Sequence, residues 1–169
     1  MIDPDDARRY YADRRDPAHD FDHVLRVTEM AVRLARAEGA DVEVVRAAAL
    51  LHDVGRDDAS GRDHAEVSAD VARRILESHP PEKVEAVTQA ILQHRFRSGP
   101  RPDSLEARCL FDADKLDSIG AIGIARAYAI AGALNQRLWS EPREDEIATL
   151  EKNRKLSSSL EILLATQQP

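Results

Sequence analysis

The sequence contains few of the residues that mark several protein classes. A single cysteine, Cys109, among 169 residues excludes an internal disulfide framework and a cysteine-based zinc site. Aromatic residues make up only 4% of the chain, and seven glycines and eight prolines are too few for a collagenous or low-complexity protein. The most apolar stretch, residues 119–134, is interrupted by Arg126 and is shorter than the ~20 residues of a membrane span.

Features of exported and of nucleic-acid-binding proteins are also absent. The N-terminal residues are acidic and charged and do not resemble a signal peptide, so we expect a cytoplasmic protein that binds no membrane. The net charge of −7, from 24 basic and 31 acidic residues, argues against a general affinity for nucleic acids or anionic membranes. This charge remains compatible with a small anionic ligand in a local basic pocket.

The residues that are abundant indicate helices. Alanine, leucine, glutamate and arginine are frequent, and neither alternating β-branched residues nor hairpin dipeptides occur. We predict one all-α domain over residues 1–169, a compact helical bundle with Asp41 and Ser104 as N-caps and Gly39 and Gly55 as helix ends. The expected helices cover residues 4–15, 17–38, 41–54, 63–78, 81–95, 104–139 and 143–166.

Two groups of histidine and aspartate lie on the inward sides of these helices. His23 shares a helix face with apolar residues one, two and three turns further on, a position that also suits an ordinary core histidine. His52 and Asp53 end a buried helix, where an ionised Asp53 is costly unless a positive group pairs with it. A divalent cation would take both the imidazole and the carboxylate as ligands, and a plain hydrogen bond between the two is the alternative.

A third group lies in residues 112–117, which contain three aspartates within an otherwise apolar helix. Asp114 lies one turn after Leu110 and Phe111, so we expect it to face the core. The alternative is a solvated acidic face with Lys115 as its counter-ion. The glycines and alanines that follow favour close helix packing and therefore the buried interpretation.

Together these motifs resemble the signature of the HD-domain metal-dependent phosphohydrolases. The signature consists of a histidine, a His-Asp pair and a later aspartate, in the order found here. Residues 64–69, 91–95, 104–106 and 114–126 further resemble a small, single-domain bacterial branch similar to nucleoside triphosphate pyrophosphohydrolases. The resemblance covers residues 19–126 and depends on the ordered set of motifs, because a His-Asp dipeptide alone is common.

The resemblance implies that His23, His52, Asp53 and Asp114 bind one divalent metal ion. Two histidines and two aspartates leave coordination positions for water or phosphate oxygens, as a catalytic metal requires. The mixed nitrogen and oxygen ligands favour Mn²⁺, with Mg²⁺, Co²⁺, Ni²⁺, Fe²⁺ or Zn²⁺ as alternatives.

The resemblance also places His64 and His94 around the pocket. In some branches of the family such histidines complete a second metal site, and in others they contact substrate phosphates. We favour phosphate contact, because the motifs resemble the single-metal branch. Lys115, beside a proposed ligand, and Arg56, in the turn after the His-Asp pair, are further candidates for binding phosphate. His19 lies either at the mouth of the pocket or on the surface.

Residues 95–101 contain three arginines and no acidic residue, which gives a local positive charge suited to bidentate phosphate binding. Arg95 and Arg97 are the candidates for substrate contacts within this segment. Asp57 and Asp117 could support the metal ligands or substrate, or act as a general base, and the sequence does not choose between these roles.

These features predict a metal-dependent phosphohydrolase that cleaves (deoxy)nucleoside triphosphates or related nucleotides by attack of a metal-bound water on phosphorus. The alternatives are a phosphomonoesterase or cyclic-nucleotide phosphodiesterase at the same site, and a non-catalytic nucleotide-binding module. Residues 143–166 form an amphipathic segment that either closes the core or pairs with a second subunit in a homodimer. The residues with predicted catalytic roles are Asp53, Asp57, His64, His94 and Lys115.

Overall fold

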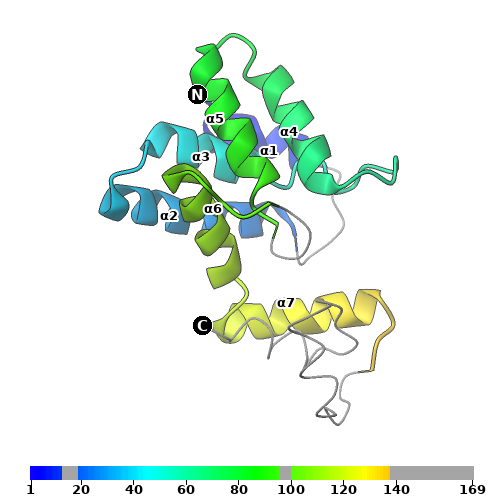
Figure 1. Ribbon diagram of the computed structural model, residues 1–169. Coiled ribbons are helices and arrows are strands. Elements are labelled where there is room, and N and C mark those ends of the chain that lie inside the picture. The colour runs from blue at the N-terminus through cyan, green and yellow to red at the C-terminus, as the bar shows by residue number, and fades with distance from the viewer. Residues whose placement is uncertain (13–18, 96–99, 138–169) are drawn as a thin grey trace. The chain divides into compact units, whose positions relative to one another are not determined.

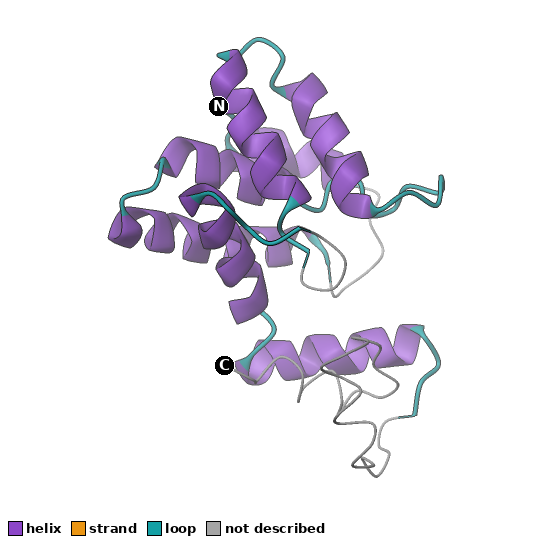
Figure 2. Cartoon of the chain, viewed as in Figure 1, coloured by secondary structure: helices purple, strands orange, loops and turns teal. Residues whose placement is uncertain are grey.

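The computed structural model describes residues 1–12, 19–95 and 100–137, and their regular structure is entirely helical (Figures 1 and 2). The all-α fold predicted from the sequence is therefore confirmed. Within these residues, no helix has the length and apolar character needed to cross a membrane. The helices are α1 (Pro4–Arg8), the 3₁₀ helix η1 (Arg9–Tyr11), α2 (Phe21–Glu38), α3 (Val42–Leu51), α4 (His64–Ile75), α5 (Pro81–Leu92), α6 (Leu105–Leu116) and α7 (Gly120–Ala133).

The chain forms two compact units, residues 1–114 and 115–169, and the boundary between them falls in the last turn of α6. In the first unit, α3 packs against α2 and α5, and α4 packs against α5. The core of this unit contains aliphatic side chains from α2 to α6, among them Val27, Leu51, Val87, Ile91 and Leu110. The single domain over residues 1–169 stays a prediction.

Aspartate N-caps fix the first turns of four helices, the first of them α1, where Asp3 is the cap. The side chain of Asp41 accepts hydrogen bonds at the start of α3, as the sequence predicts. Asp20 Oδ1 accepts a hydrogen bond of 2.9 Å from the backbone N–H of His23, and Asp63 likewise caps the helix that begins at His64. Two of the caps therefore lie beside histidines of the candidate site.

Gly55 lets the turn after α3 approach α4 closely. The expected helix over 41–54 ends earlier, at Leu51, and the chain then turns through the His-Asp pair. A Cβ atom on Gly55 would lie 2.6 Å from the backbone nitrogen of Ser68 and 2.7 Å from the side chain of Val67. The Gly55 N–H donates a hydrogen bond of 2.9 Å to Ser68 Oγ, which ties the turn to α4.

Two predicted helix boundaries near the N-terminus are wrong. The helix expected over residues 4–15 ends at Arg8 and continues as the 3₁₀ helix η1. The next helix begins at Phe21 rather than at residue 17, because Asp20 has extended backbone angles and caps it. The helix predicted over residues 143–166, with its homodimer surface, lies outside the described residues.

The single long helix predicted over residues 104–139 is also wrong. Ser104 caps α6 as expected, through a hydrogen bond of 3.0 Å from the N–H of Ala107 to its Oγ, but this helix ends at Leu116. The chain turns before α7, where Gly120 has a φ of +69°, a left-handed conformation that favours glycine. A Cβ atom at Gly123 would overlap the backbone of Ser118, so this second glycine permits the turn.

Candidate metal centre

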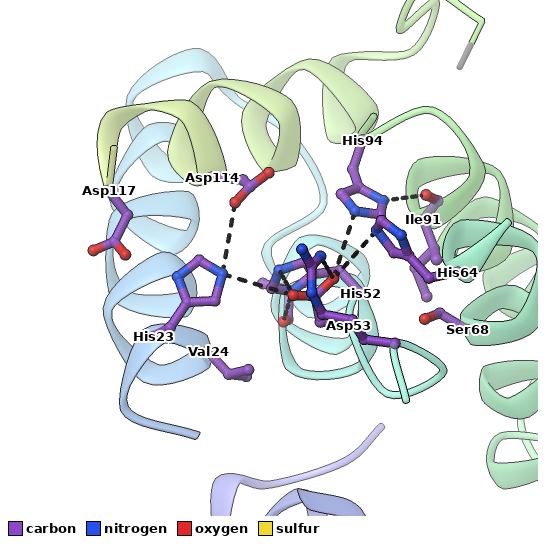
Figure 3. A network of polar contacts seen from close by, with 12 residues as sticks. His23, Val24, His52, Asp53, His64, Ser68, Ile91, His94, Asp114 and Asp117 are labelled. Carbon is purple, nitrogen blue, oxygen red and sulfur yellow. Dashed lines mark hydrogen bonds and ion pairs between the residues drawn. The ribbon is translucent and has the colours of Figure 1, made fainter. Parts of the chain in front are cut away.

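The carboxylate of Asp53 is buried among four histidine rings (Figure 3). Its Oδ2 atom lies 3.9 Å from His23 Nε2 and 3.8 Å from His52 Nε2. Its Oδ1 atom lies 3.5 Å from His64 Nε2 and 3.9 Å from His94 Nε2. Each carboxylate oxygen therefore faces two imidazole rings.

The polar atoms fall into two groups that could each hold a metal ion. The first consists of His23, His52 and Asp114, and the second of Asp53, His64 and His94; within each group the ligand atoms lie within 4.8 Å of one another. His23 Nε2 is 3.6 Å from Asp114 Oδ1. The structure thus brings together all four ligands implied by the sequence, because Asp53 of the second group also lies beside His23 and His52 of the first.

The rings of His52 and His94 are oriented by the ends of the helices that precede them. His52 Nδ1 lies 2.7 Å from the carbonyl oxygen of Ala49, and His94 Nδ1 lies 2.6 Å from that of Ile91. A carbonyl only accepts, so both Nδ1 atoms carry the proton and both Nε2 atoms present a lone pair to the site. This arrangement is typical of metal-binding histidines.

The polar atoms around Asp53 fit a cation better than direct hydrogen bonds. His52 Nε2 is buried and has no hydrogen-bond partner among the residues that the structure describes. The distances from Asp53 to its histidine neighbours exceed the roughly 2.7–2.9 Å of charge-assisted hydrogen bonds. Atoms bonded to one ion at about 2.1 Å lie roughly 3–4 Å apart, which is the spacing found here.

Charge around Asp53 keeps it ionised despite its burial. Burial raises the pKa of Asp53, but attraction to His52, Arg56, His94 and His19 holds this pKa well below its usual value. The Nη1 atom of Arg56 contributes from 3.4 Å. The site therefore presents a negative charge to a metal ion.

His94 and His64 are neutral near pH 7. Burial lowers the pKa of His94 to about 3, assisted by His52 and opposed by the nearby aspartates. Burial also lowers the pKa of His64 to about 4, where Arg56 and Arg95 act against the raising effect of Asp53. Neutral imidazoles are the form that binds metals and exchanges protons with substrates.

Arg95 contacts both the cap of α4 and its first residue. Its Nη1 atom lies 3.1 Å from Asp63 Oδ2 and 2.9 Å from His64 Nδ1. Arg56 and Arg95, both predicted to bind phosphate, therefore lie beside the second group. His19, expected at the pocket mouth or on the surface, is buried with its ring edge-on to that of His23, at a centroid distance of 5.8 Å.

The remaining predicted residues lie outside the two groups. Asp57 is exposed on the turn that follows Arg56. Lys115 is half-buried in the last turn of α6, directly after Asp114 in the chain. Asp117 belongs to the second unit, where its Oδ2 atom lies 2.9 Å from Arg126 Nη1. Arg97 lies outside the described residues.

Two supporting residues, Asp63 and Ser68, were not predicted from the sequence. Asp63 is the cap that holds Arg95, and Ser68 is the buried acceptor for the Gly55 N–H. Both lie in or beside the segment 64–69 that resembles the family. The sequence did contain a signal for the Asp63 cap, because the fourth helix was predicted to start at residue 63. Nothing in the sequence indicated that Ser68 accepts a hydrogen bond from Gly55.

A family model described as HD domain matches residues 20–119. The protein YpgQ of Bacillus subtilis (strain 168) is 34% identical over 127 residues, which cover 73% of this chain and 62% of YpgQ. Ribonuclease Y of Cutibacterium acnes is 31% identical over 151 residues, which cover 72% of this chain and 26% of that enzyme. The chain therefore spans less than two thirds of the length of these relatives.

Solved structures show the same fold. A predicted HD superfamily hydrolase from an uncultured Thermotogales bacterium matches with a TM-score of 0.64 and 36% identity, covering 88% of this chain and 80% of that one. The crystal structure of Bacillus subtilis YpgQ in complex with ADP matches with a TM-score of 0.64 and 31% identity, covering 89% and 78%. Because the family match extends over more than half of the chain and includes all four candidate ligands, the chain belongs to the HD-domain family.

Proposed function

We propose that the protein is a metal-dependent phosphohydrolase that acts on nucleotides, with (deoxy)nucleoside triphosphates as the favoured substrates. The observation that carries the proposal is the buried, ionised carboxylate of Asp53, which lies among four histidines and beside Arg56. A purely structural role would not require the costly burial of an ionised carboxylate among several imidazole rings.

His23, His52, Asp53 and Asp114 would hold one divalent cation, and the mixed nitrogen and oxygen ligands favour Mn²⁺. When bound, such a cation would lower the pKa of a water molecule and place positive charge beside the phosphoryl oxygens. The lone pairs on His52 and His94 Nε2 face the site before any ion arrives, because their Nδ1 protons are held by helix carbonyls.

The other residues would bind and orient the anionic substrate. The guanidinium groups of Arg56 and Arg95 suit phosphoryl oxygens, which accept two hydrogen bonds in one plane. Lys115 would add charge, as the sequence predicts. His94 Nε2 carries a lone pair, so His94 suits binding a ligand atom or accepting a hydrogen bond rather than donating to phosphate, the role that the sequence favoured.

The relatives support the nucleotide class and define the alternatives. YpgQ was crystallised with ADP, a nucleoside diphosphate. Ribonuclease Y matches over most of this chain, so an RNA phosphodiester belongs in a substrate screen, although the net charge of −7 argues against nucleic acid. A phosphomonoesterase or cyclic-nucleotide phosphodiesterase would use the same residues. A cytoplasmic location and a homodimer also remain predictions from the sequence.

The first test compares metal content and phosphate release in the wild type and in Asp53→Asn, which keeps the shape of the side chain. We expect about one equivalent of metal in the wild type and loss of both metal and activity in the variant. Asp58→Asn is the matched control, because Asp58 is an exposed carboxylate directly after the same turn. A wild type that binds no metal and cleaves no nucleotide with Mn²⁺ added would refute the proposal.

A further inference from the structure

His64 and His94 face the same oxygen of Asp53, but their rings are held in opposite ways. His94 Nδ1 donates to the carbonyl oxygen of Ile91, which leaves the lone pair on Nε2. His64 Nδ1 lies 2.9 Å from Arg95 Nη1. A guanidinium group only donates hydrogen bonds, so His64 Nδ1 accepts, and the ring proton of neutral His64 is on Nε2.

The structure holds Arg95 in place for this contact. Arg95 Nη1 has two hydrogens, and the same nitrogen that reaches His64 also lies 3.1 Å from Asp63 Oδ2. The other oxygen of Asp63 accepts a hydrogen bond of 2.9 Å from the N–H of Ala65, at the start of α4. Arg95 is therefore anchored to the same helix turn that carries His64.

We propose that Arg95 is a positioning residue that fixes His64 as a hydrogen-bond donor and thereby prevents a second metal ion from binding at Asp53, His64 and His94. A metal at His64 Nε2 would require the ring proton to move to Nδ1, where an N–H of Arg95 already points. Only two of the three ligands in this group then present a lone pair.

The proton on His64 Nε2 points toward the site, because this nitrogen lies 3.5 Å from Asp53 Oδ1. An anionic oxygen of the ligand, which under the proposed function is a phosphoryl oxygen, would accept this proton in a hydrogen bond. His64 and His94 thus differ in chemistry. His64 Nε2 donates a hydrogen bond to the substrate, whereas His94 Nε2 can only accept one.

The direct test is a long-range ¹H–¹⁵N NMR spectrum of the full chain at mildly alkaline pH, without metal and with diamagnetic Mg²⁺. His64 is assigned through His64→Gln. We expect His64 to be protonated on Nε2 and His94 on Nδ1. A proton on His64 Nδ1 in the wild type would overturn the proposal.

A pair of Arg95 variants tests the cause. Arg95→Met keeps the aliphatic part of the side chain but removes the donor, so we expect the Nδ1-protonated form of His64 to become populated. Arg95→Lys retains a donor and should largely restore the wild-type tautomer. Arg74→Met, at an exposed arginine on α4, the helix that begins at His64, is the control. An unchanged His64 tautomer in Arg95→Met would contradict the role of Arg95.

A metal titration gives an independent result. We expect the wild type to bind one equivalent of Mn²⁺ tightly and a second only weakly. In Arg95→Met the dissociation constant for the second Mn²⁺ should be lower by at least about tenfold. Two equivalents bound equally well by both proteins would overturn the proposal. The NMR result does not depend on activity, so a protein that cleaves no nucleotide would refute the proposed function and leave the assignment of the His64 proton intact.

Discussion

His94 and His64 remain neutral in the folded protein at pH values where free histidine takes up a proton. The pKa of His94 is lowered to about 3 and that of His64 to about 4 by burial, against an ordinary value of about 6.5. From about pH 6.5 down to pH 4 the unfolded chain therefore binds more protons, and the folded state loses stability as the pH falls. Each histidine contributes a slope of up to about 1.4 kcal/mol per pH unit.

Urea denaturation of the metal-free protein across this pH range measures the effect. We expect the free energy of unfolding to decrease steadily on acidification, and His94→Gln and His64→Gln each to reduce the slope. Asp53, whose lowered pKa affects stability only below about pH 5, does not contribute over most of this window. Identical slopes in the wild type and both variants would show that these histidines are not neutral in the fold.

At the residue scale, the sequence predicted which side chains meet but not how they are held. His23, His52, Asp53 and Asp114 could be grouped because each lies on an inward helix face or at a helix end. The bond between Arg95 and His64 joins residues 31 positions apart and depends on the orientation of two side chains. Helix periodicity carries no information about such an orientation.

At the scale of elements, the turn after α3 depends on the absence of a side chain at Gly55. We expect Gly55→Ala to lower the free energy of unfolding by about 1–3 kcal/mol, because its Cβ would collide with the backbone of Ser68 and the side chain of Val67. The same displacement should weaken metal binding, since His52 and Asp53 precede Gly55 on this turn.

Chemical denaturation and Mn²⁺ titration of the variant check both effects. The control is Gly132→Ala in α7, where a Cβ atom meets nothing within 4 Å. This control should be neutral or more stable by up to about 1 kcal/mol, because alanine favours a helix over glycine. A Gly55→Ala protein as stable as the control would contradict the close contact.

Helix starts were easier to predict than the interruption between α6 and α7. A cap such as Asp41 or Ser104 is a local signal, because its side chain bonds the backbone two or three residues later. The interruption depends on the left-handed conformation of Gly120. A glycine is also tolerated inside a helix, so the apolar sequence through residues 119–134 resembled a continuous helix.

At the scale of the whole molecule, the two compact units predict local rather than global effects of some substitutions. Asp117 and Arg126 form an ion pair within residues 115–169, and their side chains are only 8% and 11% exposed. We expect Arg126→Met to cost about 3 kcal/mol locally, because it leaves the Asp117 carboxylate without this guanidinium partner. Hydrogen exchange should quicken in α7 and remain slow in α2 to α5.

Mass spectrometry of the exchanged peptides provides this measurement. Arg33→Met, at an exposed arginine on α2, is the control and should leave both regions unchanged. Equal loss of protection in α7 and in α2 to α5 of Arg126→Met would show that the two units unfold together.

The candidate metal ligands come from distant parts of the first unit. His23 lies in the first turn of α2, and Asp114 lies near the end of α6, so an unfolded chain does not present them together. An ion that binds only the folded chain stabilises it by about 1.4 kcal/mol for each tenfold excess over its dissociation constant. Under the proposed function, the supply of this ion in the cell would set the lifetime of the protein as well as its activity.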